Sequence, residues 1–508
     1  MLENAVADLP DDIESLRALL VASRLENHRL RSTLIYRDAQ IEKLLLQLAR
    51  LKRMQFGAKS EKLDREIEQL ELLIEELQTP SALPPRTPVV AVEKAVPARR
   101  PLPAHLPRES IVHAPAAACP SCGGALRAIG EDVSEMLDYV PAHWKVIRHV
   151  RPKCACDACQ RIVQAEAPSR PIPRGIAAPG LLAHVLVAKY CDSLPLHRQA
   201  EMYARDGVEI ERSTLADWVG GSAALLAPLV ERLGAHVMSA TKLHADDTPV
   251  PVLSPGRGQT KTGRLWTYVR DDRPAGSTLP PAVFFKYTPD RKGEHPRQHL
   301  KSFAGTLQAD GYAGFHHLYE TGRIREAACW AHVRRKFFDI HQAHQSPIAK
   351  AALDRIAALY AVEHDIRGKP PEIRQQHRES RAGPLLAEMK QWLTTTVGTL
   401  SAKSELAAAV RYATSRWPAL TRYCGDGNLE IDNNAAERAL RVIALGRKNY
   451  LFCGSDAGGE RAAALYGLIG TAKLNGLNPE AYLRDVIGRI ADHPANRLDE
   501  LLPWNYAG

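Results

Sequence analysis

The residues best suited to chemistry in this sequence are cysteines that occur in two closely spaced pairs. Cys119 and Cys122 are separated by two residues, and Cys156 and Cys159 repeat that spacing further along the chain. Four thiolates arranged as two Cys-x-x-Cys pairs are typical of a closed, tetrahedral zinc site. Cys154 lies beside the second pair, and the spacing leaves it spare. The sequence therefore predicts one structural Zn²⁺ in a module too small to fold on its own core.

Three acidic positions indicate a second site with oxygen ligands. Asp246 and the adjacent Asp247 close one predicted strand, Asp310 closes another, and Glu437 lies near the start of a predicted helix. Taken singly, the aspartates would serve as turn residues, and Glu437 could complete a capping box with Asn434. Strand ends and a facing helix can instead bring three carboxylates together. Such ligands suit Mg²⁺, and a pair of these ions supports phosphodiester chemistry.

Arginine and lysine residues flank the acidic positions in the sequence. They could attract DNA phosphates to the site, or they could simply form solvent-exposed helix faces. The motif Cys329-Trp-Ala-His332 precedes one of these clusters, and it either helps to shape the site or packs in the core. The cations are Arg334, Arg335, Lys336, Arg438, Arg441, Arg447 and Lys448.

The N-terminal part of the chain predicts an extended, self-associating region. Residues 13–51 carry an apolar heptad with Asn27 at an a position, which is typical of a coiled coil. An intramolecular helical hairpin is the alternative. Residues 79–115 are so rich in proline that they can form neither a helix nor a sheet, and we expect an extended linker there.

A helical region follows the cysteine block. Residues 181–190, 196–205 and 213–219 have helical patterns, with Gly207 as a break before the last of them. This order resembles a helix-turn-helix, although ordinary bundle packing explains it equally well. Residues expected to contact DNA there are Arg212, Ser213 and Thr214. From residue 239 onward, predicted strands alternate with helices.

The overall composition describes a globular chain of several domains. The 508 residues carry a net charge of +9, 45% of them are hydrophobic, and 25% are charged. These values exclude a mainly disordered protein. The net positive charge is by itself only a weak indication of nucleic acid binding. No apolar run reaches the roughly 18–20 residues of a membrane span, and the N-terminus is acidic. We therefore expect a cytoplasmic protein with no membrane partner.

Several blocks together resemble the insertion sequence 66 family of bacterial DDE transposases. They are Gln-Phe-Gly-Ala-Lys-Ser-Glu-Lys at 55–62, the cysteine block at 119–159, His-Ala-Asp-Asp-Thr-Pro-Val at 244–250, Ala-Asp-Gly-Tyr at 309–312, and the stretch 431–455. The last block is the most specific, and it contains Glu-Arg-Ala-Leu-Arg followed by Gly-Arg-Lys-Asn. The resemblance covers nearly the whole chain.

The resemblance implies a multidomain α+β fold with a ribonuclease-H-like α/β catalytic core. Asp246, Asp310 and Glu437 would hold two Mg²⁺ (or Mn²⁺) ions, with Asp246 chosen over Asp247 by analogy; the family more often has Glu in the second position. An aromatic residue is usual where this chain has Cys154. The expected regions are a coiled-coil or leucine-zipper-like region at 1–78, a linker at 79–115, a zinc-binding module at 116–165, a helix-turn-helix-like DNA-binding region at 175–235, the core at 236–465 with a helical insertion at about 346–423, and C-terminal helices at 466–508.

The expected function is that of a DNA transposase that binds element ends and catalyses metal-dependent hydrolysis and strand transfer. Its expected partners are end and target DNA, a second copy through the coiled coil, and small accessory proteins of the same element. One alternative is a non-catalytic, decayed or domesticated DNA-binding protein that keeps the zinc module and coiled coil. Another is a metal-dependent nuclease that cuts DNA without joining it.

Overall fold

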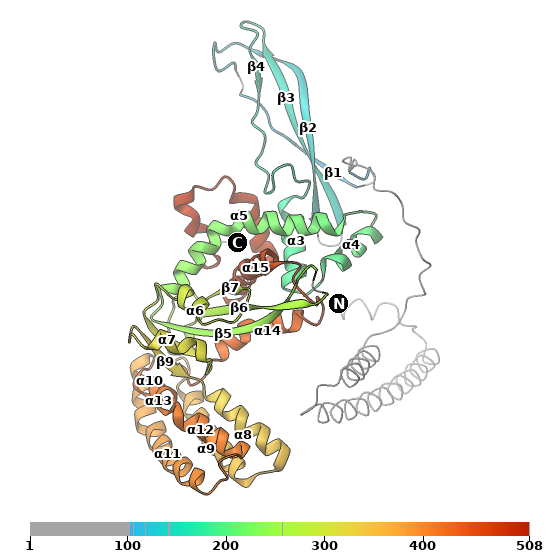
Figure 1. The fold of residues 1–508 in the computed structure, drawn as a ribbon. Helices are drawn as coiled ribbons and strands as arrows, with labels where there is room; N and C mark the ends of the chain where they lie inside the picture. The colour runs from blue at the N-terminus through green and yellow to red at the C-terminus, as the bar shows by residue number, and fades with distance from the viewer. Residues whose placement is uncertain (1–101, 105, 117, 141–142, 257, 507–508) are drawn as a thin grey trace, which may run out of the picture. The chain divides into compact units, whose positions relative to one another are not determined.

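The computed structural model describes residues 102–506, apart from 105, 117, 141–142 and 257. These residues belong to one compact unit that spans 100–508. The predicted coiled coil at 1–78 and most of the predicted linker lie outside the described residues. The prediction that residues 79–115 form no sheet is wrong at their C-terminal end, because Arg108–Val112 form a strand between the prolines and pair with the strand His143–Cys156. Within the unit, two mixed β-sheets are combined with helices (Figure 1).

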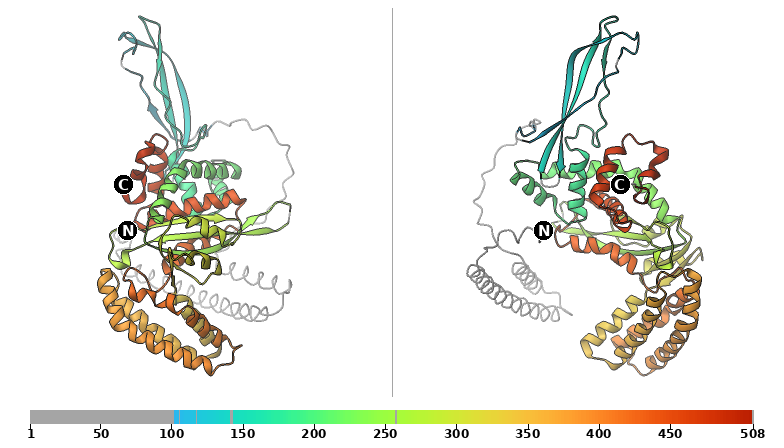
Figure 2. Two further views of the ribbon diagram at one scale, coloured as in Figure 1. Left: turned by 60° about the vertical axis from the view of Figure 1, so that its left-hand side comes forward. Right: turned by 180° about the vertical axis from the view of Figure 1, so that it is seen from behind.

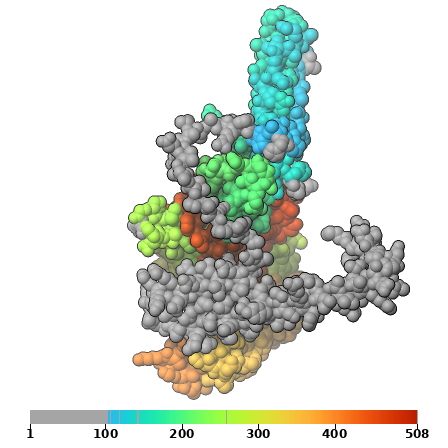
Figure 3. Space-filling view, turned by 90° about the vertical axis from the view of Figure 1, so that its right-hand side faces the viewer, coloured from blue at the N-terminus to red at the C-terminus, as the bar shows by residue number. Residues whose placement is uncertain are grey.

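The cysteine block folds as a small sheet around a long hairpin, which the sequence patterns did not predict. Strands β2 and β3 pair antiparallel, with a register shift between Ala128 and Gly130. The strand β1 runs parallel to β3, and β4 pairs antiparallel with its end. These residues gather into one blue-to-cyan lobe in the space-filling view (Figure 3). The strands are β1 (Arg108–Val112), β2 (Leu126–Val140), β3 (His143–Cys156) and β4 (Ile162–Gln164).

The end of the hairpin beside its turn is attached to the helices that follow it. Leu137 and Val146 are buried in the main hydrophobic cluster. The backbone N–H of Ala178, at the start of α3, donates to the carbonyl of Leu137 at 2.7 Å. The hairpin and the first helices therefore share one core. These helices are α3 (Pro179–Tyr190), α4 (Leu196–Arg205) and α5 (Arg212–Met238).

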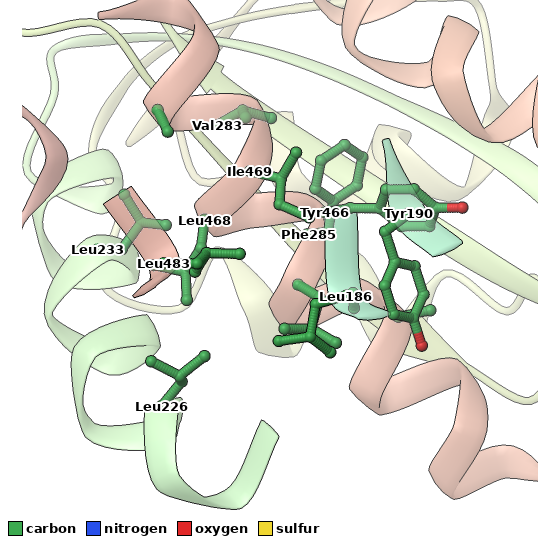
Figure 4. Close-up of a cluster of buried hydrophobic side chains, with 14 of the residues drawn as sticks. Leu186, Tyr190, Leu226, Leu233, Val283, Phe285, Tyr466, Leu468, Ile469 and Leu483 are labelled. Carbon is green, nitrogen blue, oxygen red and sulfur yellow. The ribbon is translucent and has the colours of Figure 1, made fainter. Parts of the chain in front are cut away.

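Helix α5 corrects the predicted end of the third helix in this region. A short helix ending near residue 219 was expected, but α5 has 27 residues and continues through Pro228. Leu226 and Leu233 are fully buried, and Figure 4 shows them in the same cluster as Leu468 and Leu483. This apolar packing stabilises the long helix, because helical stability comes mainly from burial of one face. By length and composition alone, α5 is also the one helix in the described part of the chain that could cross a membrane.

The second sheet lies between these helices and a helical bundle. Its strand order is β7-β6-β5-β8-β9. The strands β7, β6 and β5 pair antiparallel, whereas β5, β8 and β9 pair parallel and need crossover connections. Two short helices, α6 (Glu294–His299) and α7 (His316–Tyr319), lie in those connections. The strands are β5 (Lys242–Leu253), β6 (Thr260–Arg270), β7 (Ala282–Thr288), β8 (Gly305–Ala309) and β9 (Ile324–Ala328).

A helical bundle follows β9 and has a hydrophobic core of its own, which includes Trp330, Ile356 and Leu393. Its polar centre contains two fully buried arginines, Arg374 and Arg378, and both contact Glu363. Figure 1 shows the bundle as a group of helices separate from α5 and α15. The helices are α8 (Trp330–His344), α9 (Pro347–Ile366), α10 (Pro371–His377), α11 (Gly383–Gly398), α12 (Glu405–Ser415) and α13 (Trp417–Thr421).

After the bundle the chain returns to the second sheet. Helix α14 (Asn434–Gly446) packs against β5 and β6, and α15 (Asp456–Leu474) packs against β7 and α5. Helix α16 (Pro479–Arg489) packs against α3. Figure 2 shows these helices from two further sides. The sheet therefore receives its covering helices from segments on both sides of the bundle in the sequence.

Candidate active site and zinc module

The four predicted zinc ligands lie together at the far end of the β2–β3 hairpin. The sulfur atoms of Cys119 and Cys159 are 3.4 Å apart, and those of Cys122 lie 3.5 Å from Cys156 and 3.4 Å from Cys159. A tetrahedral ion with Zn–S bonds of about 2.3 Å would separate its ligands by roughly 3.8 Å. A backbone N–H of Ser121 is the main cause that lowers the pKa of the Cys119 thiol to about 6. This donor set fits zinc.

Cys154 is not part of this cluster. It lies on β3 opposite Ala128 and Val163 in the sheet and is half-buried. The ligand atoms of the four clustered cysteines all lie within 4.8 Å of one another. Among the described residues, Cys154 thus takes the spare position that its spacing predicted.

Two of the three candidate acidic residues lie on neighbouring parallel strands. Asp246 is on β5, and Asp310 directly follows β8. In the parallel register of β5 and β8, His244 lies opposite Gln308. Asp246 and Asp310 each follow two residues later along the chain. Because side chains alternate along a strand, Asp246 and Asp310 project from the same face as that pair. Parallel pairing therefore brings the two carboxylates to the same end of the sheet.

A buried asparagine attaches the start of α14 to β5. The side chain of Asn433 is fully buried, and its Nδ2 donates to the carbonyl of Ala245 at 2.8 Å. Its Oδ1 lies 3.1 Å from Nδ1 of His244, which is buried as well. Both contacts involve the residues directly before Asp246. Glu437 lies one helical turn after Asn433, so these bonds set its position relative to Asp246.

A second attachment joins β8 to the segment before α14. The side-chain amide of Gln308 donates to the carbonyl of Glu430 at 2.7 Å and accepts from its N–H at 2.9 Å. On β5, the ammonium group of Lys242 donates to the carbonyl of Asn428 at 2.9 Å. These buried polar contacts take the place of solvent and fix the segment across both strands. Gln308 and Lys242 lie two and four residues before Asp310 and Asp246 on their respective strands.

The electrostatics of Asp246 indicate that the carboxylates are close to one another. Burial raises the pKa of Asp246 to about 7, with further contributions from Asp310, Asp247 and Glu437. A buried carboxylate beside like charges binds a proton or a cation more readily than an exposed one. Perturbed pKa values of this kind are frequent at functional sites.

Asp247 is in a different environment from its neighbour. Its side chain is 1% exposed and accepts hydrogen bonds from Arg264 at 3.0 Å and from Arg291 at 2.7 Å. These two cations neutralise the carboxylate and occupy its oxygens. Asp246 accepts a bond from the adjacent backbone N–H at 2.7 Å, and no arginine contact is recorded for it among the described residues. This contrast favours Asp246 as a metal ligand.

Glu437 has a further neighbour in the Cys-x-x-His motif at the start of α8. Nδ1 of His332 lies 3.8 Å from Oε1 of Glu437. Among the described residues, the potential ligand atoms of Cys329, His332 and Glu437 all lie within 4.8 Å of one another, whereas Asp246, Asp310 and Glu437 do not form such a group. The three carboxylates are thus neighbours in an open arrangement.

The capping explanation for Glu437 is wrong. The first helical residue of α14 is Asn434, whereas the capping box required it to be the N-cap. Its N–H donates to the carboxylate of Asp432 at 3.2 Å, and the N-cap Asn433 makes no side-chain capping bond. The carboxylate of Glu437 is 41% exposed. It is therefore accessible to a ligand.

Two of the three candidate acidic residues, Asp246 and Glu437, border a cleft of about 830 Å³ between α8 and α14, whereas Asp310 is not among the residues that line it. Four of the predicted DNA-contacting cations line it, and Asp246 and Glu437 lie in its wall. A mobile polyanion could therefore be attracted to the carboxylates by the surrounding positive charge. The four cations are Arg334, Arg335, Arg438 and Arg441.

The remaining predicted DNA contacts lie outside this cleft. The ammonium group of Lys336 is 4.6 Å from the ring centre of Tyr412, and Arg447 donates to the carbonyl of Pro249 at 2.5 Å. Lys448 is exposed just after α14. The other three are at the start of α5, where two are exposed and one is half-buried: Arg212, Ser213 and Thr214.

Sequence reasoning did not find the residues that hold the site in place. Asn433, His244 and Gln308 form its buried contacts, and Arg291 neutralises Asp247. The available signal was that His244 and Asn433 lie within the blocks 244–250 and 431–455 and that Gln308 directly precedes the block 309–312. Arg291 lies outside these blocks, and a buried bond between distant segments leaves no spacing pattern in the sequence.

Family models match along most of the chain. The model described as "Transposase IS66 family" matches residues 174–461, and the "IS66 C-terminal element" matches 467–504. The "zinc-finger binding domain of transposase IS66" matches residues 117–160. The model "Transposase C of IS166 homeodomain" matches 43–111. The zinc-finger match and the four-cysteine cluster together indicate a structural zinc ion.

Three proteins of Sinorhizobium fredii (strain NBRC 101917 / NGR234) are similar over most of their length. Uncharacterized protein y4hP is 40% identical over 489 residues, which cover 91% of this chain and 88% of the relative. Uncharacterized protein y4qI is 38% identical over 532 residues, covering 99% and 98%. Uncharacterized protein y4jD is 40% identical over 415 residues, covering 80% and 81%. These similarities, and a family model that matches more than half of the chain, show that the protein belongs to the IS66 family of transposases.

Proposed function

We propose that the protein is the catalytic transposase of an insertion sequence, and that it cuts and joins DNA at the cleft between α8 and α14. One observation supports the proposal: Asp246 and Glu437 lie in the wall of one cleft, and Asp310 directly follows the strand that pairs parallel with the strand of Asp246. The mixed sheet with order β7-β6-β5-β8-β9 supports a ribonuclease-H-like core. The helices between β9 and α14 would then be an insertion into that core.

The residues of the site fit Mg²⁺ or Mn²⁺. Three carboxylates offer hard oxygen ligands. Burial is the main cause of the raised pKa of Asp246, and the neighbouring carboxylates add negative charge that a cation would compensate. Asp246, Asp310 and Glu437 would hold two ions. When bound, such ions activate a hydroxyl for attack and stabilise the leaving oxygen of a phosphodiester.

The protein's own groups would position the DNA. Arg334, Arg335, Arg438 and Arg441 would bind backbone phosphates along the cleft, which fixes the register of the strand without reading its sequence. Asp247 would keep Arg264 and Arg291 in place behind the site. Asn433 would hold Glu437 at a constant distance from Asp246.

Other regions would recognise and pair the DNA ends. We assign end binding to the zinc module and to the start of α5, and pairing of protomers to the coiled coil at 1–78. Residues 466–508 would support the core, and small accessory proteins of the same element would take part in the reaction. End and target DNA are thus the principal partners.

The proposal is tested by movement of a marked element in cells. The marker lies between the native ends, and the neighbouring open reading frames are supplied. We expect Glu437→Gln to reduce movement by about 1000-fold or more, equivalent to about 4 kcal/mol of lost transition-state stabilisation. Asp339→Asn is the matched control, because Asp339 lines the same cleft from α8 but is not a proposed ligand.

Three outcomes distinguish the alternatives. Equal movement with wild type and Glu437→Gln, at equal protein levels, contradicts the assignment of Glu437. Cut ends without joined products indicate a nuclease. End binding without cutting by purified wild-type protein indicates a non-catalytic DNA-binding protein.

A further inference from the structure

We infer that Cys329, His332 and Glu437 form a second transition-metal site, distinct from the four-cysteine cluster, that takes an ion of the zinc class. Their potential ligand atoms all lie within 4.8 Å of one another. The set combines a sulfur, an imidazole nitrogen and a carboxylate oxygen. These are the three ligand types that zinc accepts, whereas Mg²⁺ takes oxygen ligands.

The two cysteine-motif ligands lie on the first turn of one helix. Cys329 is the N-cap of α8, and its side chain is 3% exposed. His332 follows three residues later, and residues three apart share one face of a helix. A Cys-x-x-His sequence at this position therefore presents both ligands in the same direction. This geometry depends only on the start of α8.

The third ligand comes from α14, and the start of that helix is attached to Cys329. The backbone N–H of Asn433 donates to the sulfur of Cys329 at 3.1 Å. Such bonds from backbone groups orient a metal ligand and support charge on it. Asn433 is itself held by β5, as described above. The first turns of α8 and α14 are thus fixed side by side, with Glu437 opposite His332.

The imidazole of His332 also points to a ligand. Its Nδ1 is inaccessible to solvent and makes no hydrogen bond. Glu437 Oε1, at 3.8 Å, is too far away for a hydrogen bond but at a suitable separation for two ligands of one ion. A buried polar atom without a partner costs free energy, and an ion between the two groups would remove that cost.

The inferred site shares Glu437 with the proposed magnesium site. Three protein ligands leave a fourth coordination position open, as in non-structural zinc sites. An ion bound there would occupy the carboxylate that magnesium needs. We therefore expect zinc to inhibit magnesium-dependent DNA cleavage. Only this consequence rests on the proposed function, because ion binding itself does not require catalysis.

The test is the zinc content of the purified full-length protein after equilibration with zinc and removal of free ion. We expect two zinc ions per chain in the wild type and one in Cys329→Ala and His332→Ala. Cys424→Ala is the matched control and should retain two, because Cys424 is a half-buried cysteine of the same bundle outside both clusters. Circular dichroism spectra check that each variant is folded.

One zinc ion in the wild type, or two in both His332→Ala and Cys329→Ala, would overturn the inference. Because His332 is one-third exposed, its replacement is expected to leave the fold intact even if Cys329→Ala does not. A failure of the proposed function has a different signature. In that case the zinc content still changes as expected, while no DNA is cut under any metal condition.

Discussion

The zinc cluster and the carboxylate site are assembled in opposite ways. All four cysteines belong to one small module, and each pair is separated by only two residues. The three carboxylates come from β5, the end of β8 and α14, and a whole helical bundle lies between the last two in the sequence. The first site depends on two short Cys-x-x-Cys turns and on the β2–β3 pairing that joins them, whereas the second depends on the packing of the entire core.

This difference has consequences for how each site tolerates change. The cysteine-bearing end of the zinc module has little hydrophobic core of its own. The stability of this end therefore depends on the four cysteine ligands, and a change of ligand also changes the fold. The carboxylate site is held by Asn433, Gln308 and Lys242, which are not ligands. Its fold and its chemistry can therefore be separated by mutation.

The largest effect is expected from removal of the structural zinc. Cys156→Ser should lower the zinc content by one ion per chain and unfold the cysteine-bearing end of the β2–β3 hairpin, because structural zinc contributes on the order of 10 kcal/mol to small modules. Limited proteolysis should then cut within 119–164, while the other end of the hairpin, which packs in the main core through Leu137 and Val146, stays protected. Cys154→Ser should retain the ion and the protection. Loss of protection throughout the core would mean that the two regions are not independent.

The adjacent aspartates should respond in opposite ways. We expect Asp246→Asn to abolish DNA cleavage, by about 1000-fold or more, with little loss of stability. Asp247→Asn should lower the free energy of unfolding by about 2–3 kcal/mol, because it removes the buried charge that Arg264 and Arg291 share, and Arg291 keeps only a longer contact with Asp310 at 3.9 Å. Urea unfolding and cleavage assays on both variants provide the measurement. The reverse pattern would assign the ligand role to Asp247.

The raised pKa of Asp246 predicts a pH dependence of stability in metal-free protein. The folded-state pKa of about 7 lies above the ordinary value of 3.8. The stability that this group contributes is therefore present at low pH and is lost as the pH rises from about 4 to about 7, by at most about 4 kcal/mol. The difference in unfolding free energy between wild type and Asp246→Asn should change across this window. A constant difference would show that the carboxyl is not perturbed.

The smallest effect is expected in the cationic cleft. Arg441→Ala should weaken DNA binding equally for all DNA sequences. The slope of log affinity against log salt concentration should fall by about one, the value for one lost phosphate contact. Lys336→Ala is the control, because Lys336 is on α8 but its ammonium group contacts Tyr412. Salt titrations of DNA affinity measure both. Equal salt slopes for wild type and Arg441→Ala would place the DNA elsewhere.

The sequence predicted that strands alternate with helices after residue 239 and that the stretch at about 346–423 is helical, and both patterns are present in the second sheet and the bundle. It missed the strands of the zinc module, where β2 is largely exposed on both faces from Leu126 to Val133 and so has no regular alternation. It also ended α5 too early, because Gly220 and Gly221 resemble a helix end. Burial of Leu226, Leu229 and Leu233 outweighs the low helix propensity of glycine.

By itself, the sequence predicted which four cysteines cluster and which acidic residues are the candidate ligands, because Cys-x-x-Cys spacing and strand ends are local properties. Only the tertiary structure decided that Asp247 is neutralised by two arginines, that Asp246 lies among carboxylates, and that His332 faces Glu437. The physical reason is that charge compensation and burial depend on segments far apart in the chain. Such interactions join residues at irregular separations in the chain, and so they produce no regular spacing in the sequence.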